Sequence, residues 1–548
     1  MSRRSWGAVL LAGALLWLVA YPIVLSAFEA IRGPAGWTLE YVRAFFARPN
    51  EWQALWGSLW ISLATVVAAA AIGVPLAFLF ARTEFPGRRV LGALVALPVA
   101  LPPLVGVLAF LFLYGESGFA AHLVRWITGS DQAPWQLQGA SAILLVHAYS
   151  MYVYFYLFVR AALDQMDGAA LEAAASLGAS RWRTLTRVTL PMLRPALVGA
   201  ALLTFTTSLA SFSAPYIFGG GFRVMTTQVL ATRLNGDTNL AMVETVALTL
   251  IALVALAFMG ADRRVLAVSG GKGSAPARHQ ATGLGRRAAM VGGWVLAAFL
   301  LLPHATLLLL SFVPVGTWTV EAVPPRYTVM NYVGLAADPE RLRPLLNSLW
   351  MATLATVAAL VIAVWAGQLV VRKRARGGRL IETLLAAPWA VPGTVFALAL
   401  ATAFSVHDPL TLRFILVGSL WILPLAYLIR NLPVASQPIL GGFRQLDPGL
   451  DEAAAGLGAS RWRRMWRVTL SLLAPALAAA GALAFVTALG DFVTSILLYT
   501  YDTRPLSLEI LASLRSGDVG EAAVYGVLLM LASAAVFLLG SRSGNATR

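Results

Sequence analysis

Residue types that carry out catalysis are scarce in this chain of 548 residues. It has no cysteine and only 5 histidines, which excludes disulfides, thiolate metal sites and cysteine nucleophiles. The phosphate-binding pattern GxxxxGK[ST] is absent, and the nearest string, SGGKGS at 269–274, lacks its first glycine and its Gly-Lys-Ser/Thr end. HExxH, GxSxG and protein-kinase signatures are absent as well. We therefore predict no catalytic residue, no resident metal and no cofactor bound by this chain.

One carboxylate, Asp491, lies within an otherwise apolar stretch. A charge in the middle of a membrane helix costs about 2.5–3.5 kcal/mol on insertion scales, and such residues commonly mark a transport pathway. The alternative is a carboxylate paired to a neighbouring helix for structural reasons. His147 and Tyr149 are further candidates, although a histidine in a membrane helix more often makes a satisfied contact between helices.

The composition predicts a membrane protein. Hydrophobic residues make up 59% of the chain and charged residues 12%, whereas soluble proteins have roughly 45–50% and about 25%. Many apolar stretches reach the ~20 residues that a helix needs to cross a bilayer, and backbone groups in lipid are satisfied within helices. The expected fold class is an all-α membrane protein of about twelve spans. These are predicted at 6–28, 56–81, 90–113, 139–160, 192–218, 241–261, 289–313, 345–371, 380–404, 412–431, 472–498 and 520–540.

The basic residues predict how the chain is oriented. With a cytoplasmic N-terminus and alternating spans, most of the 41 Lys and Arg residues fall on the cytoplasmic side, as the positive-inside rule requires. Both termini are then cytoplasmic, and the protein is a multi-pass protein of the bacterial inner membrane. The net charge of +16 is explained by orientation, so membrane lipid is an expected partner and nucleic acid is not.

A seven-residue string, LGASRWR, occurs at 177–183 and again at 457–463. The segments 172–197 and 452–477, which contain it, are identical at 19 of 26 positions. Each half of the chain holds six predicted spans, so the second half enters the membrane in the same orientation as the first. This makes a parallel repeat, with a pathway expected at the interface between the halves.

The halves are predicted at 1–262 and 289–548, joined by a basic cytoplasmic linker at 263–288 that is rich in Gly and Ser. Broken helices often line transport cavities, and prolines are expected to break the third and ninth spans. These prolines are Pro98, Pro102, Pro103, Pro388 and Pro392.

Both copies of the string lie in a long cytoplasmic loop, at 164–191 and 444–471. Asp167 and Asp447 are placed as helix N-caps, and a run of Ala and Leu follows each of them. Glycine then occurs where a left-handed residue would end the helix. We predict in each half a short helix of about ten residues that lies across the cytoplasmic face.

An alanine-rich helix face is smooth enough to enter a groove on another protein. An alternative is an interfacial helix with Trp182 and Trp462 as membrane-surface anchors. Anchoring requires only amphipathic composition, however, and would not preserve one seven-residue order between halves that otherwise differ. The repetition therefore favours docking.

These residues resemble the EAA loop of bacterial ABC importer permeases. Its pattern is Glu-Ala-Ala, three residues, Gly, nine residues, Ile or Val, one residue, and Leu-Pro. The matching residues are Glu172, Ala173, Ala174, Gly178, Val188, Leu190 and Pro191 in the first loop and Glu452, Ala453, Ala454, Gly458, Val468 and Leu470 in the second. The second loop departs from the pattern at Ser471, where proline is expected.

The resemblance implies what the loops bind. In that family each loop forms a coupling helix seated in a cleft of an ATP-hydrolysing subunit, so two loops imply a homodimer of ATPases that carries the ATP and Mg. Closure of that dimer switches the pore between inward- and outward-facing states. The chain itself would be a translocation subunit without an ATPase site of its own.

Fused double permeases of this kind resemble the ferric-iron and thiamine importers, with aminophosphonate systems close by. The segment 490–510 is more similar to the iron type, so ferric iron is the expected solute; thiamine, aminophosphonate or another small solute is the alternative. The leading solutes are cationic. The expected pathway residues are therefore Asp491, its counterpart Ser211, His147 and Tyr149.

Such importers receive their solute from a soluble periplasmic or extracellular binding protein. Arg233 and Asp237 in RLNGD loosely mirror Arg515 and Asp518 in LRSGD. These charges are expected to grip the two lobes of the binding protein, unless they are solvated loop charges. The main rival interpretation is a secondary transporter of the major facilitator type, also with twelve spans and a basic central loop.

Overall fold

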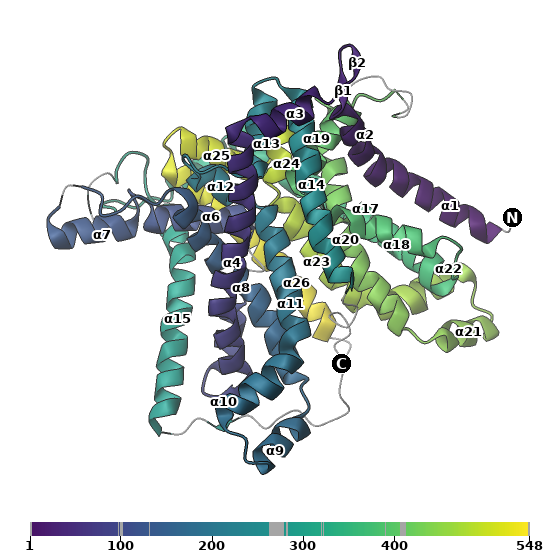
Figure 1. Cartoon of the computed structure of the whole chain (residues 1–548), viewed down its shortest axis with the longest axis horizontal. Helices are drawn as coiled ribbons and strands as arrows, with labels where there is room; N and C mark the ends of the chain where they lie inside the picture. The colour runs from purple at the N-terminus through teal and green to yellow at the C-terminus, as the bar shows by residue number, and fades with distance from the viewer. Residues whose placement is uncertain are drawn as a thin grey trace.

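The computed structural model describes residues 3–96, 98, 102–130, 132–261, 279–280, 283–318, 321, 323–389, 391–405, 411 and 413–545. It is built almost wholly of helices (Figure 1). The elements of the first half are α1 (Arg3–Leu15), η1 (Leu16–Ala20), α2 (Tyr21–Glu29), β1 (Arg32–Gly33), β2 (Gly36–Trp37), α3 (Glu40–Ala47), α4 (Pro49–Arg82), β3 (Thr83–Glu84), α5 (Arg88–Val95), α6 (Pro103–Tyr114), α7 (Phe119–Thr128), α8 (Gly139–Asp164), α9 (Gly168–Ser176), α10 (Arg181–Thr184), η3 (Leu185–Thr189), α11 (Leu190–Leu209), α12 (Ser213–Phe218), α13 (Met225–Leu234) and α14 (Thr238–Ala261).

The second half repeats this order. Its elements are β4 (His279–Gln280), α15 (Gly283–Leu310), α16 (Met330–Ala337), α17 (Pro339–Gly367), η4 (Gln368–Arg372), α18 (Gly378–Ala386), η5 (Ala387–Trp389), α19 (Gly393–Ala403), α20 (Ile422–Gln445), α21 (Pro448–Gly456), α22 (Arg461–Arg464), η7 (Met465–Thr469), α23 (Leu470–Leu489), α24 (Val493–Leu498), α25 (Leu506–Arg515) and α26 (Val519–Asn545). The predicted pair of parallel repeats is confirmed. Two short pairings complete the described part: β1 is antiparallel to β2, and β3 is parallel to β4.

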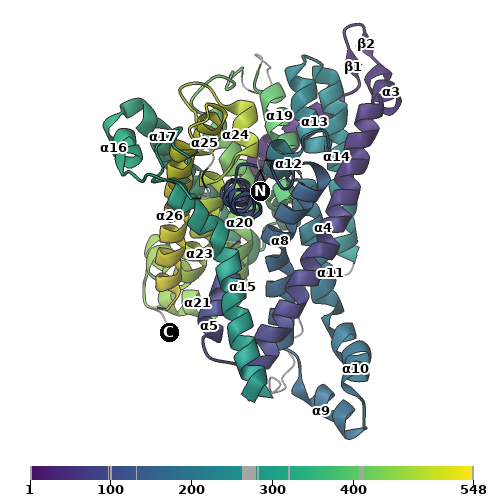
Figure 2. The same cartoon turned by 90° about the vertical axis from the view of Figure 1, so that its left-hand side faces the viewer.

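We call the end of the molecule that carries α9 and α21 the inner end, and the opposite end, with α13 and α25, the outer end (Figures 1 and 2). The first helices of the two halves are exchanged. α1 and α2 pack on α18 and α19 of the second half, and α15 packs on α5 and α6 of the first. Each half therefore packs against the first helix or helices of the other half. These contacts fix the position of one half relative to the other.

Ten helices in the described ranges are long and apolar enough to cross a membrane, or eleven if the bent pair α18–α19 counts as one span. The prediction of a tenth span at 412–431 is wrong, because the helix there is α20 at Ile422–Gln445. α20 carries Arg430 and Arg444 and packs against α17 and α23. Its neighbours bury most of it, so it does not need the apolar surface that a lipid-facing helix requires.

The third and ninth spans are broken as the prolines predicted. α5 ends at Val95 and α6 begins at Pro103, while α18 and α19 meet at an angle of 109°. The segment 114–138, between the third and fourth predicted spans, contains a further helix, α7. Most of the predicted linker at 263–288 lies outside the described residues, and α15 already begins within it at Gly283.

The fifth and eleventh spans differ from the prediction in a way that bears on function. Each was expected to continue without interruption, but α11 ends at Leu209 and α23 at Leu489. α12 and α24 follow after three residues. At their inner ends both spans extend further than expected, because α10, η3 and α11 form one run from Arg181 to Leu209, matched by Arg461–Leu489. Each run of 29 residues is roughly 44 Å long.

Close contact between α4 and α8 depends on a glycine. A methyl group at Gly73 would lie 2.3 Å from the carbonyl oxygen of Tyr152 and 2.7 Å from Cβ of Phe155. The obstructing atoms belong to the backbone or adjoin it, so rotation of a side chain cannot make room. Gly106 in α6, by contrast, has no atom within 4 Å of the same position.

We predict that Gly73→Ala destabilises the protein, because α4 and α8 must separate to admit the methyl group. Overpacking of this kind typically costs 1–3 kcal/mol, and the melting temperature of the detergent-purified protein should fall accordingly. Gly106→Ala is the matched control and should melt no lower than the wild type, because its Cβ position is open and alanine favours a helix. Equal melting temperatures for the two variants would contradict the packing described here.

Candidate functional site: two coupling loops and the contact between the halves

The predicted loop helices form with the predicted caps. The carboxylate of Asp167 accepts a hydrogen bond from the backbone N–H of Ala169 at 3.0 Å, and that of Asp447 from Gly449 at 2.9 Å. These bonds satisfy N–H groups that the first turn of a helix leaves without a partner. The resulting helices, α9 and α21, have 9 residues each and lie at the inner end (Figures 1 and 2).

A left-handed glycine ends each loop helix. Gly178 has φ +74° and Gly458 has φ +79°, a conformation that costs a residue with a side chain roughly 1–2 kcal/mol. Ser180 and Ser460 then cap α10 and α22 by accepting from the N–H of the residue three positions on, both at 3.3 Å. Each loop therefore turns sharply into the long run that crosses the membrane.

The two loops present the same surface. Glu172 and Glu452 are exposed, as are Ala173 and Ala453, whereas Ala174 and Ala454 are half-buried. The apolar residues before the glycines protrude most, since Leu177 is 88% exposed and Leu457 is 89% exposed. Each loop therefore exposes an apolar surface made of a leucine and a tryptophan (Trp182 or Trp462).

The loops differ in one pair of interactions between side chains and backbone, which only the second loop has. Arg464 donates to the carbonyl oxygen of Asp451 at 3.3 Å, and its guanidinium lies 3.5 Å from the Asp451 carboxylate. Leu171 and Thr184 occupy the matching positions of the first loop. The pair is partly exposed and long, and surface ion pairs typically contribute no more than ~1 kcal/mol, so the two loop helices remain close to equivalent.

At their far ends, the two long runs stop where the halves meet. The rings of Phe212 and Phe492 have centroids 5.7 Å apart, and the ring of Tyr216 lies 5.1 Å from Phe212 and 6.0 Å from Phe492. Phe212 and Phe492 are equivalent residues of the repeat. A residue can touch its own equivalent only close to the two-fold axis that relates the halves, so this aromatic contact lies on that axis.

A second close approach reinforces the aromatic contact. A methyl group at Gly490 would lie 2.5 Å from Cβ of Pro102, the proline that precedes α6 in the other half. Arg515 also crosses between the halves: it donates to the hydroxyl of Tyr216 and lies 5.7 Å above the centre of its ring. The contact between the halves therefore combines rings, backbone and one cation.

Asp491 directly precedes Phe492 and is paired. Its carboxylate lies 2.8 Å from Nη1 of Arg430 on α20. It also accepts from the N–H of Thr494 at 2.8 Å and of Ser495 at 3.3 Å, and from the Thr494 hydroxyl at 3.1 Å. The same Arg430 atom donates to the Thr494 hydroxyl at 3.0 Å. Removing one member of such a pair leaves a buried charge uncompensated.

In the first half, Ser211 directly precedes Phe212 and binds His147. The Nε2 atom of His147 lies 2.9 Å from the Ser211 hydroxyl, and Nδ1 lies 3.2 Å from Thr65 and 3.1 Å from Ser208. The histidine is 1% exposed. Both ring nitrogens thus have partners, as the structural alternative for a lone membrane histidine requires.

Tyr149 lies elsewhere. Its hydroxyl donates to the carbonyl oxygen of Leu300 at 2.5 Å and lies 3.4 Å from Nδ1 of His304, and both of these residues are on α15. The structure therefore brings His147 and Ser211 together, places Asp491 at the matching position of the other half, and uses Tyr149 to hold the exchanged helix.

The four charges expected to grip a binding protein are engaged within the chain. Arg233 donates to the Thr238 hydroxyl, and Asp237 pairs with Arg48 at 3.2 Å. Asp518 caps α26 by accepting from the N–H of Glu521 at 2.8 Å. Arg233 and Arg515 are not equivalent, because Arg515 ends α25 whereas Leu234, not Arg233, ends α13. The arginines of RLNGD and LRSGD therefore do not match, although the aspartates Asp237 and Asp518 do.

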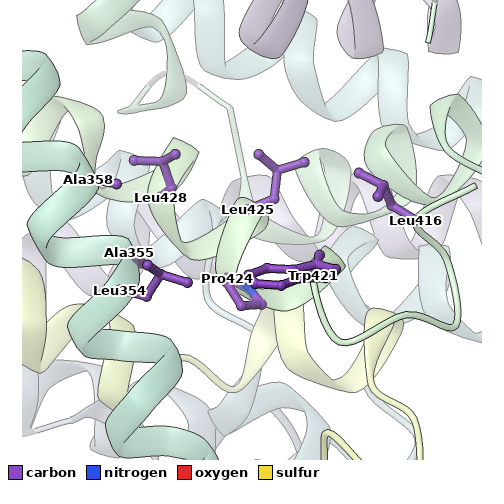
Figure 3. A pocket seen from close by; sticks show the side chains of 8 residues that line it. All are labelled: Leu354, Ala355, Ala358, Leu416, Trp421, Pro424, Leu425 and Leu428. Atoms are coloured by element: carbon purple, nitrogen blue, oxygen red, sulfur yellow. The ribbon is translucent and has the colours of Figure 1, made fainter. Parts of the chain in front are cut away.

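An apolar pocket of about 220 Å³ lies between α17, α20 and the segment before α20 (Figure 3). Its lining offers no group that would bind a charged solute, and Leu354 and Trp421 are exposed at its edge. The lining residues are Leu354, Ala355, Ala358, Leu416, Trp421, Pro424, Leu425 and Leu428. Within the described ranges, no group of three or more His, Asp and Glu side chains is arranged to hold a metal ion.

Comparison with known proteins decides what this architecture is. The sequence profile of the family described as "Binding-protein-dependent transport system inner membrane component" matches the chain twice, at residues 73–266 and 359–545. The chain belongs to this family. It is a permease, the multi-pass inner-membrane subunit of an ABC importer, and not a secondary transporter of the major facilitator type.

Several curated relatives support the assignment. The permease is 29% identical over 549 residues to "Probable ABC transporter permease protein y4fN" of Sinorhizobium fredii, covering 98% of this chain and 95% of the relative. It is 28% identical over 466 residues to "Ferric transport system permease protein FbpB" of Actinobacillus pleuropneumoniae, covering 83% and 65%. It is 33% identical over 169 residues to "Molybdenum transport system permease protein ModB" of Escherichia coli, covering 31% and 72%.

Sequence reasoning missed three functional residues of the permease. Phe212 and Phe492 were not singled out, although they are identical residues 280 positions apart, each directly after a candidate pathway residue. Arg430 was also missed. It is an arginine within a membrane span and the natural partner to seek for an intramembrane Asp491, and the misplaced tenth span obscured its depth.

We predict that Gly458→Ala loosens the second loop, because alanine strains the left-handed position by roughly 1–2 kcal/mol. Trypsin should then cut faster after Arg461 and Arg463 in the purified permease. Gly456→Ala, two residues earlier, is the control. Gly456 is helical, its Cβ position is open, and alanine there favours the helix by about 1 kcal/mol, so cleavage should slow. Equal cleavage of the two variants would contradict the predicted turn.

The absence of native cysteine allows a clean test of the contact on the axis. We predict that a short bis(methanethiosulfonate) reagent joins the two thiols of Phe212→Cys/Phe492→Cys in the resting permease through two disulfides, with release of two methanesulfinate ions, as measured by intact mass. ATP-driven uptake should stop and should return when the link is reduced. The single variants are the controls and should keep their uptake after the same treatment. A double variant that is fully linked yet still transports would show that this contact need not open.

Proposed function

We propose that the permease imports ferric iron. The observation that carries this proposal is the extent of similarity. The ferric permease of Actinobacillus pleuropneumoniae aligns with 83% of the chain and thus with both halves, whereas the molybdenum permease of Escherichia coli aligns with 31%. The two halves of a fused double permease differ from each other and act together on one solute. Similarity across both halves is therefore a better guide to the solute than similarity to one half.

The proposed motor is a homodimer of ATPase subunits, one seated on each loop helix. α9 and α21 have the same caps, the same exposed residues and the same left-handed glycine, which supports identical partner clefts. ATP and Mg bind to these partners, and Glu172, Ala173, Ala174 and Gly178, with Glu452, Ala453, Ala454 and Gly458, form the coupling surface. The inner end, the N-terminus and the C-terminus are then cytoplasmic.

The proposed stroke follows the two long runs. A shift of α9 passes through the Ser180 cap into the run Arg181–Leu209, and a shift of α21 passes likewise into Arg461–Leu489. Both runs end beside the pathway candidates Ser211 and Asp491, next to the Phe212–Phe492 contact. Closure of the ATPase dimer would therefore pull on the two sides of this contact together and part the rings.

A solute-binding protein is proposed to dock at the outer end, over α13 and α25. Asp237, Asp518 and Arg233 stabilise helix ends there, and Arg515 binds Tyr216 beside the aromatic contact. Docking that draws Arg515 away from Tyr216 would loosen this contact from outside. Arg515 thus links the docking face to the pathway, and the other three charges contribute mainly by shaping that face.

We predict that proteoliposomes containing the permease, its ATPase and its binding protein accumulate ⁵⁵Fe in an ATP-dependent manner. Glu172→Ala/Glu452→Ala should reduce accumulation to background, because both loops lose their exposed carboxylate at the coupling surface. Exposed Glu40 is far from the loops along the chain, and Glu40→Ala is the control that should transport normally. Accumulation of ⁹⁹Mo-molybdate but not iron would contradict the cargo, and full uptake by the double variant would contradict the coupling.

A further inference from the structure

The two side chains of the ion pair beside the contact between the halves, Arg430 and Asp491, differ in exposure. The side chain of Asp491 is 5% exposed, whereas that of Arg430 is 27% exposed. Four donors surround the Asp491 carboxylate: Arg430, the Thr494 hydroxyl, and the N–H groups of Thr494 and Ser495. A carboxylate has about four lone-pair sites for such bonds. Asp491 is therefore enclosed and already satisfied, which leaves it little capacity to bind a cationic solute.

Arg430 still has donors to offer. A guanidinium has five N–H groups, and the hydrogen bonds of Arg430 to described residues all start from Nη1. Some side-chain nitrogen and oxygen atoms of the described residues are fully buried and have no hydrogen-bond partner. Nε and Nη2 of Arg430 do not belong to this group. The exposed part of this side chain is thus a positive, hydrogen-bonding surface.

The surroundings place Arg430 close to the contact between the halves. Arg430 packs on Gly393 at the start of α19, where a methyl group would lie 2.2 Å from Nη1. Its partner Asp491 lies between Gly490, which touches Pro102, and Phe492, which touches Phe212. The guanidinium is therefore held at the level of the aromatic contact on the two-fold axis.

The first half has no charged residue at the three positions that match this site. Ser150, Pro103 and Ser211 stand at the positions that match Arg430, Gly393 and Asp491. His147 is enclosed, with both ring nitrogens bound. Of these matched positions, Arg430 alone presents an accessible charge, and that charge is positive.

We propose that the cargo passes this point as an anion, an oxyanion or a ferric ion in an anionic chelate, and that the free N–H groups of Arg430 contact it. Arginine suits this task because its planar fork matches carboxylate and phosphate-like oxygens. Asp491 is then a positioning residue that aims the guanidinium. This inference rests on the proposed import function and replaces the expectation that Asp491 itself receives a cationic cargo.

The test uses the complete complex in proteoliposomes, with ⁵⁵Fe supplied as ferric citrate and, separately, ⁹⁹Mo-molybdate. Arg430→Gln should lower uptake at least tenfold while the complex still assembles and hydrolyses ATP. Arg430→Lys should lose less, since it keeps the charge without the fork. Asp491→Asn should also lose less than Arg430→Gln, because the guanidinium remains.

Chemical rescue separates a contact with cargo from a structural ion pair. In Arg430→Cys, the single thiol attacks a methanethiosulfonate reagent, forming a mixed disulfide and releasing methanesulfinate. An aminoethyl reagent, which restores a positive charge after folding, should recover uptake at least fivefold. A methyl reagent or a sulfonatoethyl reagent should not.

Other results would overturn the inference. Equal losses in Arg430→Gln and Asp491→Asn, with recovery in the exchanged pair Arg430→Asp/Asp491→Arg, would show a purely structural pair. A larger loss in Asp491→Asn would show a cationic cargo. If the wild type carries molybdate but not iron, the iron proposal fails, and the same variants measured with molybdate still decide the role of Arg430.

Discussion

A helix transmits a displacement along its axis only where it is unbroken, and the rest of this structure depends on where the fifth and eleventh spans stop. Each forms one run of 29 residues from the inner loop, Arg181–Leu209 and Arg461–Leu489. Each ends three residues before a short outer helix. The breaks bring Phe212 and Phe492 together, so each run extends from a loop helix at the inner end to the contact between the halves. Without the breaks, these residues would be part of continuous helices and could not turn to the axis.

Sequence signals that act within a few residues predicted the loop helices at the inner end. They did not predict the breaks in the fifth and eleventh spans. The caps at Asp167 and Asp447 and the turns at Gly178 and Gly458 follow from side chains and backbone that act within a few residues. The breaks after Leu209 and Leu489 were missed because the flanking segments are apolar and none of the three linking residues is a proline, although Gly490 and Asp491 are residue types that favour helix ends. The linking residues contact the other half, and such a contact is not visible in the sequence. The role of Tyr149 was missed for the same reason, since its partner is a helix exchanged from the other half.

The tenth span shows how apolarity can mislead. An apolar run suggested 412–431, but the helix extends to Gln445 and includes two arginines. Hydropathy identifies helices that face lipid, whereas α20 is enclosed by α17, α23 and α24. An enclosed helix is free to carry polar groups if its neighbours satisfy them. The helix whose bounds the hydropathy pattern predicted least accurately, α20, is therefore the one that carries Arg430.

The two halves have diverged unevenly, and the pattern has a physical reason. At the inner end, the loops keep the same capped helix, the same exposed leucine and the same glycine turn, because a symmetric partner would impose one shape on both. Beside the axis, Gly393, Arg430 and Asp491 replace Pro103, Ser150 and Ser211, and these changes depend on one another. A side chain at 393 would collide with the guanidinium, and the guanidinium without Asp491 would be an uncompensated charge next to the aromatic contact. Two halves that belong to one chain do not need the same residue at matched positions, and here only the second half carries charges beside the axis at these positions.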